Sequence, residues 1–195
     1  FCNCYTLITA MTILLIFLIG LCLGSFLNVV IFRLDRKEGI LTGRSECPKC
    51  LQQLKWYDLF PVVNYLFLKG KCRNCKEKIS PVYPTTELIT ATCLSLFYWF
   101  YKPAFGVGDF YYILIIVSFV SLIFFDYLYF LIPDKIILPL TIISVLFNYF
   151  FRRPEFLNLL LSALVLGGIF AIIHLASEGK WVGFGDAKLL FLIGL

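Results

Sequence analysis

The sequence predicts an all-α polytopic membrane protein with a small cytoplasmic module, stapled by zinc, between its first two helices. Three observations support this fold class. Hydrophobic residues make up 61% of the 195 residues, and the mean hydropathy of +0.90 is far above that of an ordinary soluble domain. The apolar residues gather in long runs, as helices that cross a bilayer require. Four cysteines form two CxxC pairs inside the most basic part of the chain.

Six apolar runs give about six predicted helices. A spanning helix needs about 20 apolar residues, so the first and fifth runs are long enough by themselves. The second to fourth runs are shorter and need flanking aromatic residues to reach across. The last run stops with the sequence, and we expect further helices to follow it. The six runs are 7–32, 86–101, 110–125, 136–151, 156–176 and 187–195.

The distribution of charge predicts how the chain crosses the membrane. We divide the sequence into a first transmembrane helix (1–32), a CxxC module (33–85) and a transmembrane core (86–195). The module carries 11 of the 17 basic residues, and the positive-inside rule therefore places it in the cytoplasm and the N-terminus outside. When the remaining runs are threaded through the bilayer, Asp126 and Asp186 fall on the same, cytoplasmic side.

These two aspartates are the candidate catalytic residues. Asp126 ends an apolar run, and Asp186 closes the segment Gly183-Phe184-Gly185-Asp186. A carboxylate at membrane depth is costly unless it is paired, hydrated or protonated, so it is a functional candidate. Two carboxylates that share a site hold one proton between them, as aspartyl proteases require. Gly183 and Gly185 allow an extended substrate to approach closely. The residues therefore predict a membrane aspartyl protease.

Three further charged residues lie near these segments. Asp134 follows a proline and suits the start of a helix, so we assign it to structure or substrate contact. Lys188 is two residues beyond Asp186 and not on the same helix face, and we expect it to extend toward headgroups or substrate. Glu87 opens an apolar run, where a first-turn acid and a member of a binding site are equally good interpretations.

The two CxxC pairs predict a structural zinc site. Each pair contributes two thiolates to a tetrahedron, and the 21 residues between the pairs are typical of four-cysteine zinc modules. The module has too few apolar residues for a core of its own, so a metal would supply folding energy. Disulfides or free thiols are the alternatives, and a reducing cytoplasm argues against disulfides. The predicted ligands are Cys47, Cys50, Cys72 and Cys75.

The chain resembles the type IV prepilin leader peptidases, which are GxGD-class aspartyl proteases of the bacterial inner membrane. The motifs that carry the resemblance run in the family's order through nearly the whole chain. They are Gly24-Ser25-Phe26-Leu27-Asn28-Val29-Val30, the two CxxC pairs, Trp56-Tyr57-Asp58-Leu59-Phe60-Pro61-Val62, Ile79-Ser80-Pro81-Val82-Tyr83-Pro84 with Glu87-Leu88, Asp126, Ile132-Pro133-Asp134 and Gly183-Phe184-Gly185-Asp186-Ala187-Lys188-Leu189.

The resemblance implies two activities at the cytoplasmic face. Such enzymes remove the short basic leader of a pilin-like precursor after a glycine, and many then methylate the new N-terminal amine with S-adenosylmethionine. The motif match places the protease aspartates on Asp126 and Asp186. The implied partners are type IV prepilins, pseudopilins or competence pseudopilins together with the lipid bilayer, and no nucleic acid.

The site for the methyl donor is the least determined part of the sequence. No glycine-rich nucleotide-binding loop follows a strand in this chain. We place the donor near Trp56, Asp58, Gly70 and Glu87, where an aromatic face, an acid and a flexible backbone occur together. The alternative is that Trp56 packs inside the module and Gly70 makes a turn. The alternative for the whole chain is a membrane transporter or scaffold with a zinc-stapled module, which would show transport without cleavage.

Overall fold

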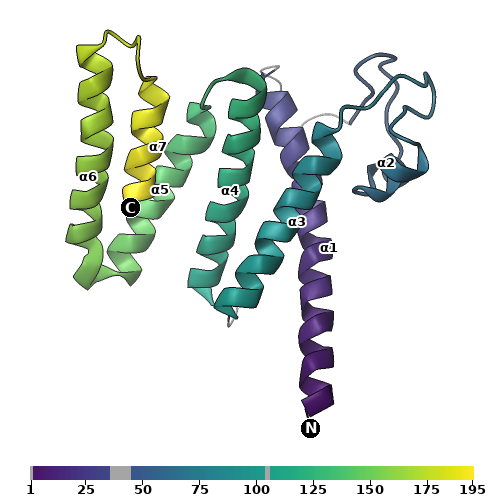
Figure 1. Cartoon of the computed structure of the whole chain (residues 1–195), viewed down its shortest axis with the longest axis horizontal. Helices are drawn as coiled ribbons and strands as arrows, with labels where there is room; N and C mark the ends of the chain where they lie inside the picture. Colours follow the sequence, from purple (N-terminus) through teal and green to yellow (C-terminus); the bar gives the residue numbers. More distant parts are fainter. Residues whose placement is uncertain (1, 36–44, 104–105) are drawn as a thin grey trace. The chain divides into compact units, whose positions relative to one another are not determined.

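The computed structural model describes residues 2–35, 45–103 and 106–195. In this part of the chain the regular structure is helical, apart from two isolated β-bridges (Figure 1). The predicted all-helical class is therefore confirmed. The helices are α1 (Cys2–Asp35), η1 (Trp56–Leu59), α2 (Val63–Phe67), α3 (Val82–Tyr101), α4 (Val107–Tyr129), α5 (Asp134–Phe151), α6 (Arg153–Ala176) and α7 (Phe184–Gly194).

Four helical segments are long and apolar enough to cross a membrane. Their mean hydropathies lie between 1.5 and 2.6, and only 11% to 28% of their most apolar stretches is buried, as expected for surfaces that face lipid. The helix α3 has 20 residues but is not among the four, because its threonines, Glu87 and its tyrosines lower its hydropathy. The four segments are Leu7–Asp35, Val107–Tyr129, Asp134–Phe151 and Arg153–Ala176.

The chain divides into two compact units, Phe1–Phe124 and Phe125–Leu195. The first unit contains α1, the CxxC module, α3 and most of α4. The second contains the end of α4 together with α5, α6 and α7. The three segments predicted from the sequence are divided by composition and charge. The two units are instead divided by which helices pack against one another. Asp126 and Asp186 both belong to the second unit.

Small residues bring α1 and α3 into close contact in the first unit. A Cβ atom on Gly20 would lie 2.5 Å from the Cα atom of Ala91, and one on Gly24 would lie 2.5 Å from the Cα atom of Glu87. Gly20 and Gly24 are four residues apart and share one face of α1, the spacing with which small residues join membrane helices. One turn further, the Asn28 side-chain amide donates to the carbonyl of Tyr83 at 3.0 Å. The pair is thus fixed in register.

In the second unit α7 packs against α6 and, less extensively, against α5. Gly167 of α6 provides space for Phe191, because a Cβ atom there would lie 2.8 Å from the Cβ atom of Phe191. The last carbonyls of α7 accept hydrogen bonds from neighbouring helices: Asn148 of α5 donates to Leu195 at 2.8 Å, and Ser162 of α6 donates to Gly194 at 2.5 Å. These bonds satisfy carbonyls that have no partner within α7 itself.

Candidate functional site

The four cysteines of the module lie on two similar turns. In each turn the N–H of the first cysteine donates to a carbonyl five residues later, at 3.0 Å for Cys47 and 2.8 Å for Cys72. The residue that follows each second cysteine has a positive φ, 55° at Leu51 and 58° at Lys76. An isolated β-bridge closes each turn. The equal CxxC spacing therefore folds into two equivalent knuckles.

The knuckles bring the four thiols together as the sequence predicts. The sulfur atoms of Cys47, Cys50, Cys72 and Cys75 all lie within 4.8 Å of one another, and those of Cys47 and Cys75 are 3.8 Å apart. A tetrahedron with Zn–S distances of about 2.3 Å has sulfur separations of about 3.8 Å, so the cluster fits a four-coordinate metal. The backbone N–H groups of Cys75 and Asn74 lower the pKa of the Cys72 thiol to about 7, which favours the thiolate that binds metal.

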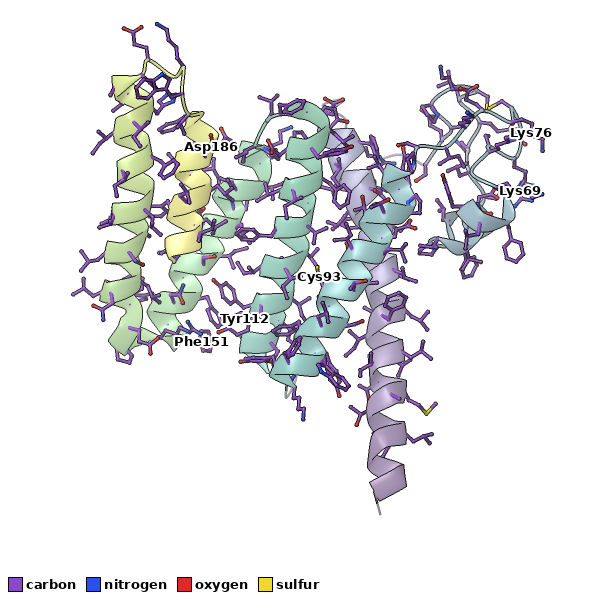
Figure 2. All side chains as sticks on the ribbon, in the orientation of Figure 1. Lys69, Lys76, Cys93, Tyr112, Phe151 and Asp186 are labelled. Carbon is purple, nitrogen blue, oxygen red and sulfur yellow. The ribbon has the colours of Figure 1, made fainter. Side chains whose placement is uncertain are left out.

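The Gly183-Phe184-Gly185-Asp186 segment forms the start of α7, and Figure 2 shows Asp186 in its first turn. The carboxylate of Asp186 turns back to accept the N–H of Gly183 at 3.0 Å, so it caps its own helix. Gly185 packs against Ile132, because a Cβ atom on Gly185 would lie 3.0 Å from the Ile132 Cβ atom. The two glycines thus have different roles. The N–H of Gly183 binds the Asp186 carboxylate, and the missing side chain of Gly185 leaves room for Ile132, which precedes α5.

An ion pair joins the start of α7 to the start of α5. The ammonium of Lys188 lies 2.6 Å from the Asp134 carboxylate and 5.0 Å from the centre of the Phe184 ring. We expected Lys188 to extend toward headgroups or substrate, and the structure instead places its charge on Asp134. Asp134 is the first residue of α5, as its position after a proline predicts. This pair and the contact of Gly185 with Ile132 hold the GxGD turn against α5.

The loop before the GxGD segment is held by His174, the single histidine of the chain. Its Nδ1 atom lies 2.7 Å from the carbonyl oxygen of Val182, and its ring lies 5.5 Å from the ring of Phe184. A Cβ atom on Gly179, whose φ is +76°, would lie 3.2 Å from the imidazole. His174 therefore fixes the path of the chain into the GxGD turn.

Asp126 lies in the last turn of α4, and its side chain is exposed. Within the described residues its carboxylate has no hydrogen bond or ion pair, and its backbone carbonyl accepts the N–H of Phe130 at 2.8 Å. The structure therefore places Asp126 in the same unit as Asp186 without a direct bond between the two carboxylates. A carboxylate at the C-terminal end of a helix opposes the helix dipole, so Asp126 contributes nothing to capping α4.

The residues that we placed near the methyl donor lie around α2, in separate surroundings. Asp58 forms an ion pair with Arg73 at 2.8 Å, while Gly70 lies against the Tyr65 hydroxyl. The buried Glu87 carboxylate accepts the N–H of Val62, the residue before α2, at 2.7 Å. The side chain of Trp56 lies outside the described residues.

Sequence reasoning missed the partners of these residues, because each partner is distant in the chain or is a backbone group. Ser25 also hydrogen-bonds Glu87, which joins the C-terminal half of α1 to the first turns of α3. The signal for this contact was present in part, since Ser25 follows Gly24, whose missing side chain admits Glu87.

Both halves of the chain match models of known protein families. Residues 18–101 match the model of the bacterial peptidase A24 N-terminal domain, and residues 112–195 match that of the type IV leader peptidase family. No solved structure matches the chain.

Several curated relatives are named prepilin leader peptidase/N-methyltransferase. The protein of Klebsiella pneumoniae is 34% identical over 92% of this chain and 82% of its own length. That of Vibrio cholerae is 33% identical over 93% of this chain and 76% of its own length. The chain spans 54% of the relative from Myxococcus xanthus, with 32% identity. The chain therefore belongs to the type IV leader peptidase family.

Proposed function

We propose that this chain is a membrane aspartyl endopeptidase of the bacterial inner membrane. Its substrates are type IV prepilins, pseudopilins or competence pseudopilins, and it removes their short basic leaders at the cytoplasmic face. Family membership supports the reaction class. The observation that carries the proposal is the GxGD turn, in which Asp186 begins a helix that is braced against α5 by Lys188 and Gly185.

We assign the chemistry to Asp126 and Asp186. An aspartyl dyad holds one proton, so that one carboxylate takes a proton from water while the other polarises the peptide carbonyl. The capping bond from Gly183 uses Oδ2 of Asp186 and leaves Oδ1 available to water or substrate. Asp126 is exposed and can approach from the end of α4. Catalytic contacts are often long before substrate binds, so the absence of a direct bond between the two aspartates is compatible with this assignment.

The experiment that tests the proposal uses the purified chain in detergent and a precursor peptide with a basic leader and an apolar stem. Mass spectrometry of the peptide, with and without S-adenosylmethionine, should show a cut after the glycine in both cases. It should show one added methyl group only when the methyl donor is present. An intact precursor under conditions where a family relative cuts it would contradict the proposal. Transport without cleavage would favour a transporter.

For the methyl donor we propose a site beside α2. A cavity of about 420 Å³ is lined by Phe60, Val63, Asn64, Phe67, Leu68 and Arg73. The Phe60 ring suits an adenine, and the Arg73 guanidinium suits a carboxylate. Asp58 adjoins this cavity, because it binds Arg73 and its carbonyl accepts from Asn64 at 2.8 Å. Trp56 is in the same turn as Asp58.

Gly70 and Glu87 support this cavity by fixing the two ends of α2. Glu87 binds Val62 before the helix. After the helix, the N–H of Gly70 donates to the carbonyl of Tyr65 at 2.8 Å. We therefore treat both residues as positioning groups for the cavity, with Asp58 in contact with the donor.

Replacing Gly70 by leucine should impair methylation more than cleavage. Gly70 has a φ of +67°, which a side chain disfavours, and a Cβ atom would lie 3.0 Å from the Tyr65 hydroxyl. The strain should shift α2 and its cavity, while Asp126 and Asp186 belong to the other unit. The measurement is the ratio of methylated to cleaved product. Tyr65→Phe, which removes the hydroxyl 3.0 Å from the new Cβ atom, is the matched second substitution and should partly restore methylation in Gly70→Leu. Equal loss of both activities would mean that Gly70 merely supports folding.

We further propose that the four cysteines hold one Zn²⁺ with a structural role. The donor set is all thiolate and leaves no position for water, which is typical of closed structural sites. The ion would join the two knuckles, because each contributes two of its four ligands. The second knuckle directly precedes the segment that leads into α3.

A further inference from the structure

A second cavity of the module is basic. It has a volume of about 400 Å³ and lies at the other side of α2, between its C-terminal end and the start of α3. Its lining combines three lysines and a tyrosine with a short stretch that leads into α3. The lining residues are Tyr65, Lys69, Gly70, Lys71, Lys78, Ile79, Ser80 and Pro81.

The positive charges around this cavity are brought together by the fold. Lys71 and Lys78 are directly opposite each other in an antiparallel β-bridge, so their side chains lie on the same face. Like charges in this arrangement repel each other. Lys69 follows α2 with a φ of 51°, and Figure 2 shows it beside this helix. The turn at Lys69 and Gly70 thus adds a third ammonium to the facing pair.

No carboxylate within the described residues forms an ion pair with these three lysines. Asp58 is already bound to Arg73. Glu77 is adjacent to Lys78 in the sequence, but neighbouring residues of an extended segment point to opposite faces. The repulsion among the lysines is therefore not relieved by the module itself, and an external anion would relieve it.

The chemistry of the cavity excludes the two ligands that the proposed function already requires. A prepilin leader is basic, and S-adenosylmethionine carries a sulfonium and an ammonium against one carboxylate. Both would be repelled by three lysines. A phosphate group, in contrast, accepts hydrogen bonds from several ammonium groups and from a tyrosine hydroxyl at once.

The surroundings indicate that the phosphate belongs to a lipid. Leu66 and Phe67 lie three and two residues before Lys69, are adjacent to each other, and are 67% and 82% exposed, so they form an apolar patch beside the lysine turn. Pro81 of the cavity adjoins α3, whose exposed Leu88 and Ile89 suit a lipid environment. Apolar side chains beside lysines are typical of surfaces that lie at the headgroup level of anionic membranes.

We propose that the cavity formed by Tyr65, Lys69, Lys71 and Lys78 binds the phosphate of an anionic phospholipid headgroup, and that Leu66 and Phe67 enter the adjacent acyl boundary. The lipid would anchor the module beside the helix α3. This inference does not rest on the proposed peptidase activity, since lipid binding can be measured in the absence of any precursor.

Native mass spectrometry of the full chain in neutral detergent tests the proposal by counting bound lipids. The probes are phosphatidylglycerol, phosphatidylcholine and inorganic phosphate. The wild-type chain should bind phosphatidylglycerol in preference to phosphatidylcholine. Because both lysines attract an anionic lipid, Lys71→Gln with Lys78→Gln should weaken phosphatidylglycerol binding by roughly thirtyfold.

The matched control replaces Lys49 and Lys76 by glutamine, which removes the same charge from the same module outside the cavity. It should bind as the wild type does, and equal weakening of both variants would overturn the proposal in favour of general charge attraction. Full competition by inorganic phosphate at equal concentration would overturn the assignment to lipid. Metal content reports whether each variant folds. If Lys71→Gln with Lys78→Gln loses metal, Lys69→Gln, which lies outside the knuckles, provides the decisive measurement.

Discussion

Replacing either Asp126 or Asp186 by asparagine should abolish precursor cleavage while the protein still inserts in the membrane. Asparagine has nearly the shape of aspartate but cannot take a proton from water or hold the proton of a dyad. Loss of one general acid–base group lowers a rate by roughly 10²- to 10⁴-fold, so the remaining cleavage should be near the detection limit. Asp186→Asn keeps an oxygen that can accept the N–H of Gly183, and the start of α7 should therefore stay folded. The measurement is the rate of leader release in detergent at equal protein concentration.

Asp134→Asn is the matched control for this pair of substitutions. The same chemical change is made at an aspartate of the same unit, and the asparagine oxygen can still accept a hydrogen bond from Lys188. Because Asp134 binds a lysine and begins α5, we expect this variant to keep a substantial part of the activity. If Asp134→Asn is as inactive as Asp126→Asn, the choice of Asp126 over Asp134 as the partner of Asp186 fails. Full activity of either Asp126→Asn or Asp186→Asn would contradict the dyad.

The helices could be predicted from the sequence because hydrophobic runs report directly on segments that need an apolar environment. Each of the six runs lies in a helix of the structure, except that the last run extends one residue beyond α7. Their ends were less accurate: α3 begins at Val82, several residues before its apolar run, because Pro84 is in the first turn, where proline is tolerated. The short helix α2 was not predicted, since its five residues are too few to show a helical period.

The candidate sites differ in how far local spacing determines them. The four-thiol cluster was predictable, because each CxxC pair holds its two sulfur atoms close together through local structure. Only one long-range contact, between the two knuckles, is then needed to form the cluster. The ion pair between Asp134 and Lys188 joins residues 54 positions apart, so no local pattern indicates it. Glu87 is a similar case, because its partner is the backbone N–H of Val62, which any residue type would provide. Contacts between residues that are distant in the sequence can be identified only when the packing of the helices is known.

Replacing Cys72 by serine should remove zinc from the module and unfold it. Cys72 is buried, and its thiol is favoured as a thiolate by the N–H groups of Cys75 and Asn74. A serine hydroxyl does not ionise near neutral pH and is a poor zinc ligand. The module has little apolar core within the described residues, and the metal therefore supplies much of its folding free energy. Metal analysis should give about one zinc per wild-type chain and much less in the variant.

The control is Cys93→Ser, which removes a thiol from α3 outside the cluster and should leave the zinc content unchanged. Limited proteolysis should cut the module of Cys72→Ser rapidly, while the second unit, which contains Asp126 and Asp186, stays protected. Cleavage activity should consequently fall through weaker substrate docking, with a larger effect on KM than on kcat. A wild-type preparation without metal whose module resists protease would contradict the structural role of zinc. Loss of kcat at unchanged KM would instead place the metal in the chemistry of the reaction.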